Sequence, residues 1–141
     1  MDATQRVIPY LSYEDGVTAI EWLSRAFGFR ERAGSRMIVD GRVAHAEMDT
    51  GSGFFMLATP NKDYESIKRH REHCESARRW SSVPWLIDGV LVLVSDLGAL
   101  LQRANAAGAV ILSEIEPGPP APRFRAEDIE GHRWMFMEVK Q

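Results

Sequence analysis

The sequence contains a single cysteine, Cys74, and no strong excess of charge of either sign. One cysteine has no partner within the chain, which excludes an internal disulfide and a thiolate metal cluster. Its polar neighbours offer no activating base, so we expect Cys74 to have no catalytic role. The formal net charge of -3 creates no field that attracts phosphate backbones, and nucleic acid is therefore not an expected partner.

Long apolar runs are also lacking. The first ten residues contain no apolar run of signal-peptide length, and no later segment reaches the roughly 18 apolar residues of a membrane span. We therefore expect a cytoplasmic protein with no membrane partner. With 141 residues, of which 45% are hydrophobic, the chain fits one domain, residues 1–141, that buries a core without help from disulfides.

The first part of the chain, residues 1–60, has the pattern of a strand, a helix and a meander of three strands. Glu14-Asp15 supplies an N-cap before apolar residues at helical spacing, and Gly28 ends the predicted helix. Asp40-Gly41 is a dipeptide typical of tight hairpin turns because both residues tolerate positive φ. The pattern predicts strands at residues 7–13, 29–39, 42–49 and 54–59.

The last part, residues 85–141, repeats this plan. Asp96 caps a second predicted helix and Gly108 ends it, as Asp15 and Gly28 do for the first. The predicted strands are 90–94, 109–115, 124–126 and 133–139. Similarity of pattern at a spacing of roughly 80 residues indicates a duplicated β-α-β-β-β unit. The charged segment 61–84 joins the two modules, and we expect a solvated surface helix there.

Three stretches resemble the glyoxalase/bleomycin-resistance/dioxygenase (vicinal oxygen chelate) superfamily, and most of all its PhnB-like branch. They are VIPYLSYEDGVTAIEWLSRAFG at 7–28, DGRVAHAEMDTGSGFFML at 40–57 and FRAEDIEGHRWMFM at 124–137. Asp128 and Gly131 match the acidic-turn signature of the family, although Ile129 stands where proline is more usual. The resemblance implies an α+β fold in which two βαβββ modules form curled sheets around a cup, commonly completed in a homodimer.

The resemblance also allows a test for a metal site. Metal-dependent members take histidine and glutamate ligands from the first and last strands of each module. Counting from the helix caps and from Gly131 places the equivalent positions at Ile8, Met56, Val90 and Met135. None of these side chains binds a hard divalent ion, so we expect no metal and no cofactor in the cup. The apolar cluster either fills the core or contacts an apolar or aromatic ligand.

Polar residues near the cup could still perform chemistry. His45 and Glu47 lie two apart in one predicted strand and, together with Val43, share a face. The pair suits general acid–base catalysis, a structural hydrogen bond across the sheet, or a relocated metal site that includes His132. The full predicted ligand-binding set is Ile8, Tyr10, Met56, Val90, Met135, Met137 and Arg133.

The leading functional hypothesis is a metal-free protein that binds a small apolar or aromatic molecule and forms a homodimer. One alternative is a lyase, isomerase or dioxygenase-type enzyme that uses His45 and Glu47 or a relocated metal. Another is a dimeric scaffold whose cup is filled by side chains. Trp80 and Trp85 flank the junction of the modules, where they suit stacking on an aromatic ligand or contact with a partner subunit.

Overall fold

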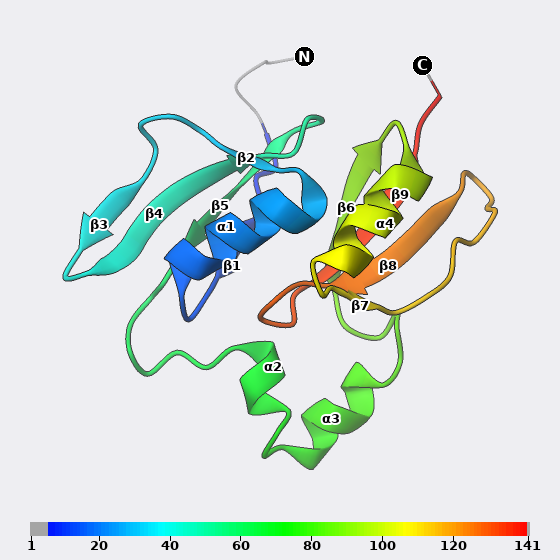
Figure 1. Cartoon of the computed structure of the whole chain (residues 1–141). Helices are drawn as coiled ribbons and strands as arrows, with labels where there is room; N and C mark the ends of the chain where they lie inside the picture. The colour runs from blue at the N-terminus through cyan, green and yellow to red at the C-terminus, as the bar shows by residue number, and fades with distance from the viewer. Residues whose placement is uncertain (1–5, 141) are drawn as a thin grey trace.

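The two halves of the chain form two separate sheets, each with one long helix (Figure 1). The computed structural model describes residues 6–140. The first half contains β1 Tyr10–Ser12, α1 Gly16–Phe27, β2 Arg30–Glu31, β3 Met37–Val39, β4 Arg42–Asp49 and β5 Phe54–Ala58. The second contains β6 Gly89–Val94, α4 Leu97–Ala106, β7 Val110–Ile111, β8 Arg123–Glu127 and β9 Arg133–Glu138. The predicted strand 29–39 is divided into β2 and β3, and the predicted strand 109–115 is shorter, as β7.

Both sheets have the same topology. The strand order is β1-β5-β4-β2 in the first, where β3 also pairs with β4, and β6-β9-β8-β7 in the second. In each sheet the first strand runs parallel to the last, and the remaining pairs are antiparallel. The predicted α+β fold with two related βαβββ modules is confirmed.

Local sequence signals explain where the helices and turns lie. The Asp15 side chain accepts a hydrogen bond from the Thr18 amide at the start of α1, and Gly28 ends that helix in the left-handed conformation with φ of 73°. Asp96 caps α4 in the same way through the Ala99 amide. The Asp40-Gly41 turn between β3 and β4 has positive φ at both residues, as a tight hairpin requires.

One apolar core joins the two modules. The rings of Phe55 in β5 and Trp134 in β9 lie 5.1 Å apart, and Phe27 at the end of α1 lies 4.8 Å from Phe136. The helices α1 and α4 also contact each other, and the indole nitrogen of Trp22 donates to the carbonyl oxygen of Ala107 at 2.9 Å. Each sheet therefore turns one face toward the shared core and leaves its other face open.

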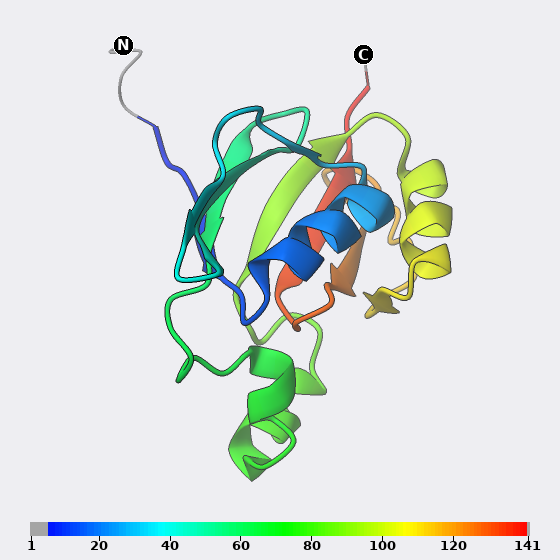
Figure 2. The same cartoon turned by 60° about the vertical axis from the view of Figure 1, so that its left-hand side comes forward.

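The segment between the modules forms two short helices, α2 Ile67–His70 and α3 Glu75–Ser81, which lie beneath both sheets (Figure 1, Figure 2). The Lys68 amide donates to the Glu130 carbonyl oxygen, and the Ser66 amide donates to the Glu14 side chain. The segment is therefore attached to both modules. None of the helices in residues 6–140 has the length and apolar character needed to cross a membrane.

The first residue of α1, Gly16, lies against the first sheet with no room for a side chain. A Cβ atom there would lie 2.8 Å from Val43 Cβ and 3.2 Å from the Thr59 hydroxyl oxygen. We expect Gly16→Ala to lower the free energy of unfolding by about 1–3 kcal/mol, because β4 must shift to relieve this overlap. Urea denaturation monitored by circular dichroism measures the change.

Gly98 in α4 provides the matched control. A Cβ atom there meets nothing closer than an Asp96 side-chain oxygen at 3.9 Å. Gly98→Ala should leave the free energy of unfolding unchanged or raise it by up to about 1 kcal/mol, because alanine is the better helix former. Equal losses in the two variants would contradict the packing argument.

Candidate functional site

Rows of side chains cross the open face of each sheet, because paired residues of neighbouring strands project to the same side. In the first sheet Tyr10 pairs with Met56, and Met56 pairs with Glu47. In the second sheet the corresponding row is Leu91, Met135 and Arg125. Each row therefore has a large aromatic or aliphatic residue on the first strand of the module, a methionine on its last strand, and a charged residue on the strand that pairs antiparallel with the last one.

The position of Val90 differs from the prediction. Val90 pairs with Trp134, which is only 1% exposed, whereas Leu91 pairs with Met135. Val90 therefore packs against the core, and the prediction that it shares a face with Met135 is wrong by one residue. A shift of one residue along a strand moves a side chain to the opposite face, so counting back from the Asp96 cap was not accurate enough. The predicted ligand contacts themselves stay predictions.

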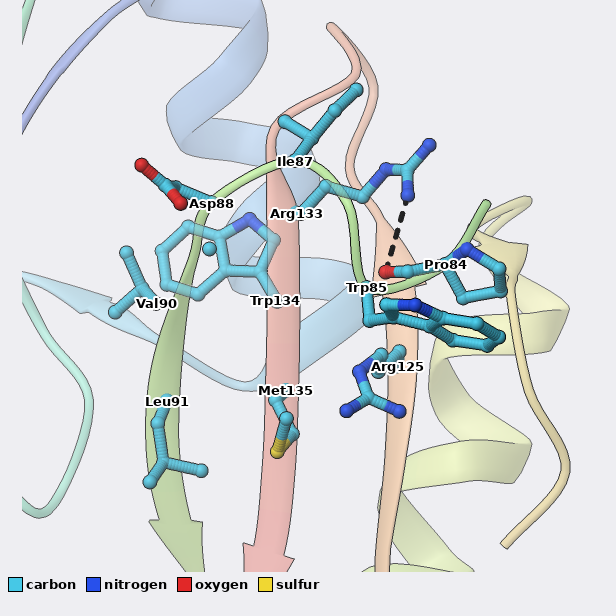
Figure 3. A pocket seen from close by; sticks show the side chains of 11 residues that line it. Pro84, Trp85, Ile87, Asp88, Val90, Leu91, Arg125, Arg133, Trp134 and Met135 are labelled. Atoms are coloured by element: carbon cyan, nitrogen blue, oxygen red, sulfur yellow. Dashed lines mark hydrogen bonds between the residues drawn. The ribbon is translucent and has the colours of Figure 1, made fainter. Parts of the chain in front are cut away.

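A cavity of about 260 Å³ lies at the end of the second sheet where residues 84–89 lead into β6, and side chains of both faces line it (Figure 3). Figure 3 shows Leu91, Met135 and Arg125 side by side on β6, β9 and β8, with Trp85 at the edge of the cavity. Trp85 is 71% exposed. The lining residues include Val90 but neither Ile8 nor Met56, so this chain does not bring the four predicted cup residues together in this cavity.

Arg133 lines the same cavity, but each nitrogen of its guanidinium group is hydrogen-bonded. It donates to Glu127 through Nε, to the Ser81 carbonyl oxygen through Nη2, and to the carbonyl oxygens of Val83 and Pro84 through Nη1. Its Nη2 also forms an ion pair with Glu127 at 2.7 Å. Figure 3 shows the bond to Pro84. All three guanidinium nitrogens therefore donate hydrogen bonds, and Arg133 holds α3 and the following residues against β9.

Glu127 also binds a second arginine. Arg71, which follows α2, donates to both carboxylate oxygens of Glu127 at 2.8 and 2.9 Å. These bonds raise the pKa of Arg71. The Glu127 and Arg133 side chains are each only 3% exposed, so this group of three charges lies at the junction of β8, β9 and the linker.

The predicted pair of His45 and Glu47 is present on the open face of the first sheet. His45 Nε2 lies 3.1 Å from Glu47 Oε2, and Arg32 Nη1 donates to the other Glu47 oxygen at 3.3 Å. The hydrogen bond from His45 and then that from Arg32 lower the pKa of Glu47. Glu47 is thus held as a carboxylate that orients the imidazole of His45.

The sequence predicted that Val43 shares a face with His45 and Glu47, and this prediction is wrong. Val43 is 1% exposed and lies in the core beneath Gly16. The Thr59 amide donates to the Val43 carbonyl oxygen, whereas Ala46 pairs with Leu57 further along β4. The register at Val43 therefore differs by one residue from the register at Ala46. The strand register therefore shifts between Val43 and Ala46, and the alternation of faces shifts with it.

The acidic turn between β8 and β9 is a structural joint. Asp128 accepts hydrogen bonds from the Tyr13 hydroxyl at 2.6 Å and from the Trp134 indole at 3.0 Å. Burial, and then the Asp128 charge, raise the pKa of Tyr13 well above its usual value. The Glu130 carboxylate accepts from the amides of Glu14 and Asp15, and burial raises the pKa of Glu130. The turn therefore ties the second module to the start of α1.

His132 belongs to this joint and not to the pair of His45 and Glu47. Its Nε2 lies 2.7 Å from the Ser12 carbonyl oxygen, and its ring packs edge-on against Tyr13 at 4.8 Å. The relocated metal site that combines His132 with His45 and Glu47 is therefore not formed. Within residues 6–140, three potential metal ligands come together at Glu65, His70 and His73, a set that the sequence analysis did not identify.

Comparison with known proteins agrees with this arrangement. The sequence profile of the Glyoxalase/Bleomycin resistance protein/Dioxygenase superfamily matches residues 11–136. The chain belongs to this superfamily. A comparison with curated protein sequences found no match.

Solved structures with the same fold include three that illustrate its range. TioX from Micromonospora sp. ML1 has 29% sequence identity and a TM-score of 0.69, over 97% of this chain and 98% of that one. A glyoxylase/bleomycin resistance protein/dioxygenase domain from Frankia sp. EAN1pec has 14% identity and a TM-score of 0.69, over 99% and 100%. Glyoxalase I from Zea mays has 12% identity and a TM-score of 0.66, over 94% of this chain and 43% of that one.

The buried group of Glu127, Arg133 and Arg71 should dominate the stability of the junction. We expect Glu127→Ala to lower the free energy of unfolding by about 3–5 kcal/mol, because it leaves buried guanidinium groups without a counter-charge. Arg71→Met removes only the more exposed partner and keeps the pair of Glu127 and Arg133, so its loss should be clearly smaller. Urea denaturation of both variants tests this order, and a larger loss for Arg71→Met would contradict it.

Proposed function

We propose that this protein binds a small apolar or aromatic molecule in a cup without a metal ion, and that a homodimer completes the cup. Membership of the superfamily supports the cup. The observation that carries the proposal is the pair of open-face rows, in which methionine occupies the last strand of each module at Met56 and Met135. Thioether side chains adapt their shape and contact aromatic rings favourably.

The composition of the first and last strands supports binding without a metal. The described strands β1, β5 and β6 contain no histidine, cysteine or carboxylate on either face. The last strand, β9, contains one carboxylate, Glu138, which accepts a hydrogen bond from the Leu97 amide at the start of α4. Hydrocarbon and thioether groups do not hold a hard divalent cation, so a correction of the register by one residue does not restore a metal site.

The exposure of the open faces supports a homodimer. Tyr10 is 60% exposed and Leu91 is 51% exposed, although both belong to the central rows. Within one chain these faces point away from the shared core, whereas the first sheet of one copy could face the second sheet of another. Such pairing would place Met56 near Met135, with Glu47 and Arg125 as opposite charges at the two sides of one cup.

The proposal predicts that an aromatic anion, anilinonaphthalene sulfonate, binds the native protein and gains fluorescence. Leu91→Glu should weaken this binding at least tenfold, about 1.4 kcal/mol, because it places a carboxylate in the apolar row. Val39→Glu is the matched control, since Val39 is 45% exposed at the tip of the β3–β4 hairpin. Fluorescence titration measures affinity, and near-UV circular dichroism confirms that both variants are folded.

Native mass spectrometry of the same samples tests the shared cup. The unmodified protein and Val39→Glu should be dimers, whereas Leu91→Glu should shift toward monomer. A monomer that binds the probe normally would remove the homodimer from the proposal and leave ligand binding intact. A dimer that does not bind the probe would instead favour a scaffold with a filled cup.

The hydrogen bond of 3.1 Å between His45 and Glu47 favours one second candidate, a lyase or isomerase in which His45 acts as the base. Binding without catalysis predicts that a metabolite extract is unchanged after incubation with the protein, as measured by mass spectrometry. Conversion of a metabolite by the unmodified protein and not by His45→Ala, with probe affinity preserved in both, would establish the enzyme instead.

A further inference from the structure

We propose that Glu65, His70 and His73 form a binding site for a divalent transition metal ion, with Zn²⁺ as the best match, in the segment that joins the two modules. These residues lie outside the strands on which the proposed cup depends. The site therefore does not rest on the proposed function.

The geometry of the three side chains carries the inference. Glu65 Oε1 lies 2.8 Å from His70 Nδ1 and 2.7 Å from His73 Nε2. The two rings are 5.2 Å apart and inclined at 83°, so they approach the same oxygen from different directions. One ligand atom from each residue lies within 4.8 Å of the other two.

The spacing is close to that of a bound ion. Zinc lies about 2.0–2.2 Å from nitrogen and oxygen ligands, which places neighbouring ligand atoms of a tetrahedral site about 3.3 Å apart. The observed separations are shorter by roughly half an ångström, as expected when protons occupy the position of the ion. Small rotations of the side chains would open the space, and the two ring nitrogens that face Glu65 must then carry no proton.

The backbone holds these residues in place without using their ligand atoms. The Ser66 side chain caps α2 by accepting from the Arg69 amide, and the His73 amide donates to the His70 carbonyl oxygen in the following turn. The Lys68 amide is bonded to the Glu130 carbonyl oxygen of the acidic turn. The metal-binding side chains therefore project from a segment that is attached to the folded modules, which lowers the entropy lost on binding.

The chemistry of the ligands indicates which ion fits. Two imidazoles and one carboxylate are the ligand set of many zinc sites with an open fourth position, whereas Ca²⁺ and Mg²⁺ prefer oxygen ligands alone. The Glu65 carboxylate already accepts hydrogen bonds from both imidazoles, so its oxygen faces both nitrogen ligands. The positive charge of Arg69 would repel a metal ion near Glu65. Its guanidinium group, however, binds Glu14 through Nη1 at 2.8 Å, and its Nε lies 3.9 Å from Glu65 Oε2, the oxygen that does not face the histidines.

Two of the three proposed ligands lie at the edge of a hollow. Glu65 and His70 line this hollow of about 510 Å³ together with Cys74, Trp80 and Ile87, whereas His73 does not line it. The hollow has room for a water molecule as an additional ligand. The bound ion would link Glu65, which precedes the N-cap of α2, to His70 at the end of α2 and to His73 in the turn before α3. It would thus stabilise the segment that Arg71 and Arg133 attach to Glu127.

Titration of chelator-treated, tag-free protein with Zn²⁺ in a calorimeter tests the site. We expect one equivalent of Zn²⁺ to bind, with release of protons, and the thermal midpoint to rise on binding. His70→Ala together with His73→Ala should weaken binding at least tenfold and abolish the rise. His45→Ala is the matched control, because it removes a histidine that also lies beside a glutamate and should leave zinc affinity unchanged.

The outcomes separate this proposal from the proposed function. If the double variant binds Zn²⁺ as tightly as the unmodified protein, the linker site is wrong. If the unmodified protein binds no equivalent of Zn²⁺ while circular dichroism shows native structure, the site is also wrong. Purified double variant that still carries stoichiometric metal would overturn the metal-free cup, and loss of anilinonaphthalene sulfonate binding in that variant would show that the two sites are coupled.

Discussion

The structure depends on one constraint, which is that two sheets share a single apolar core. The aromatic residues Phe27, Phe55, Trp134 and Phe136 meet there from α1, β5 and β9. Because this core covers one face of each sheet, the opposite faces are left to contact solvent, a ligand or another subunit. The exposed Tyr10 and Leu91 are a direct consequence of this arrangement.

Buried hydrogen bonds and ion pairs at the junction of the modules also hold the parts of the chain together. Glu127 receives two arginines, one from the linker and one from β9, and Asp128 receives Tyr13 from the first module. Buried charges and hydroxyl groups are tolerated only when each has a partner, so these contacts define one relative position of the parts. The residues of the acidic turn therefore stabilise the fold.

Within residues 6–140, the cluster of potential metal ligands and the exposed rows on the sheets lie in different parts of the chain. The open-face rows have methionine at the strands that supply metal ligands in other members of the superfamily, while histidine and carboxylate meet in the linker at Glu65, His70 and His73. A metal ion bound there would thus stabilise the segment that contains α2 and α3. In the proposed cup, ligand recognition would depend on shape, on thioether contacts and on the charges of Glu47 and Arg125.

The sequence by itself determined the parts whose signals are local. Asp15 and Asp96 cap the helices, Gly28 ends α1, and Asp40-Gly41 forms the hairpin turn, because each acts through hydrogen bonds or φ angles within a few residues. Only the tertiary structure decided three other features. The strand register places Leu91 and not Val90 beside Met135, Arg133 is buried, and the side chains of His70 and Glu65 are in contact. Those features depend on partners from other elements, whose positions are set by packing and not by the neighbouring sequence.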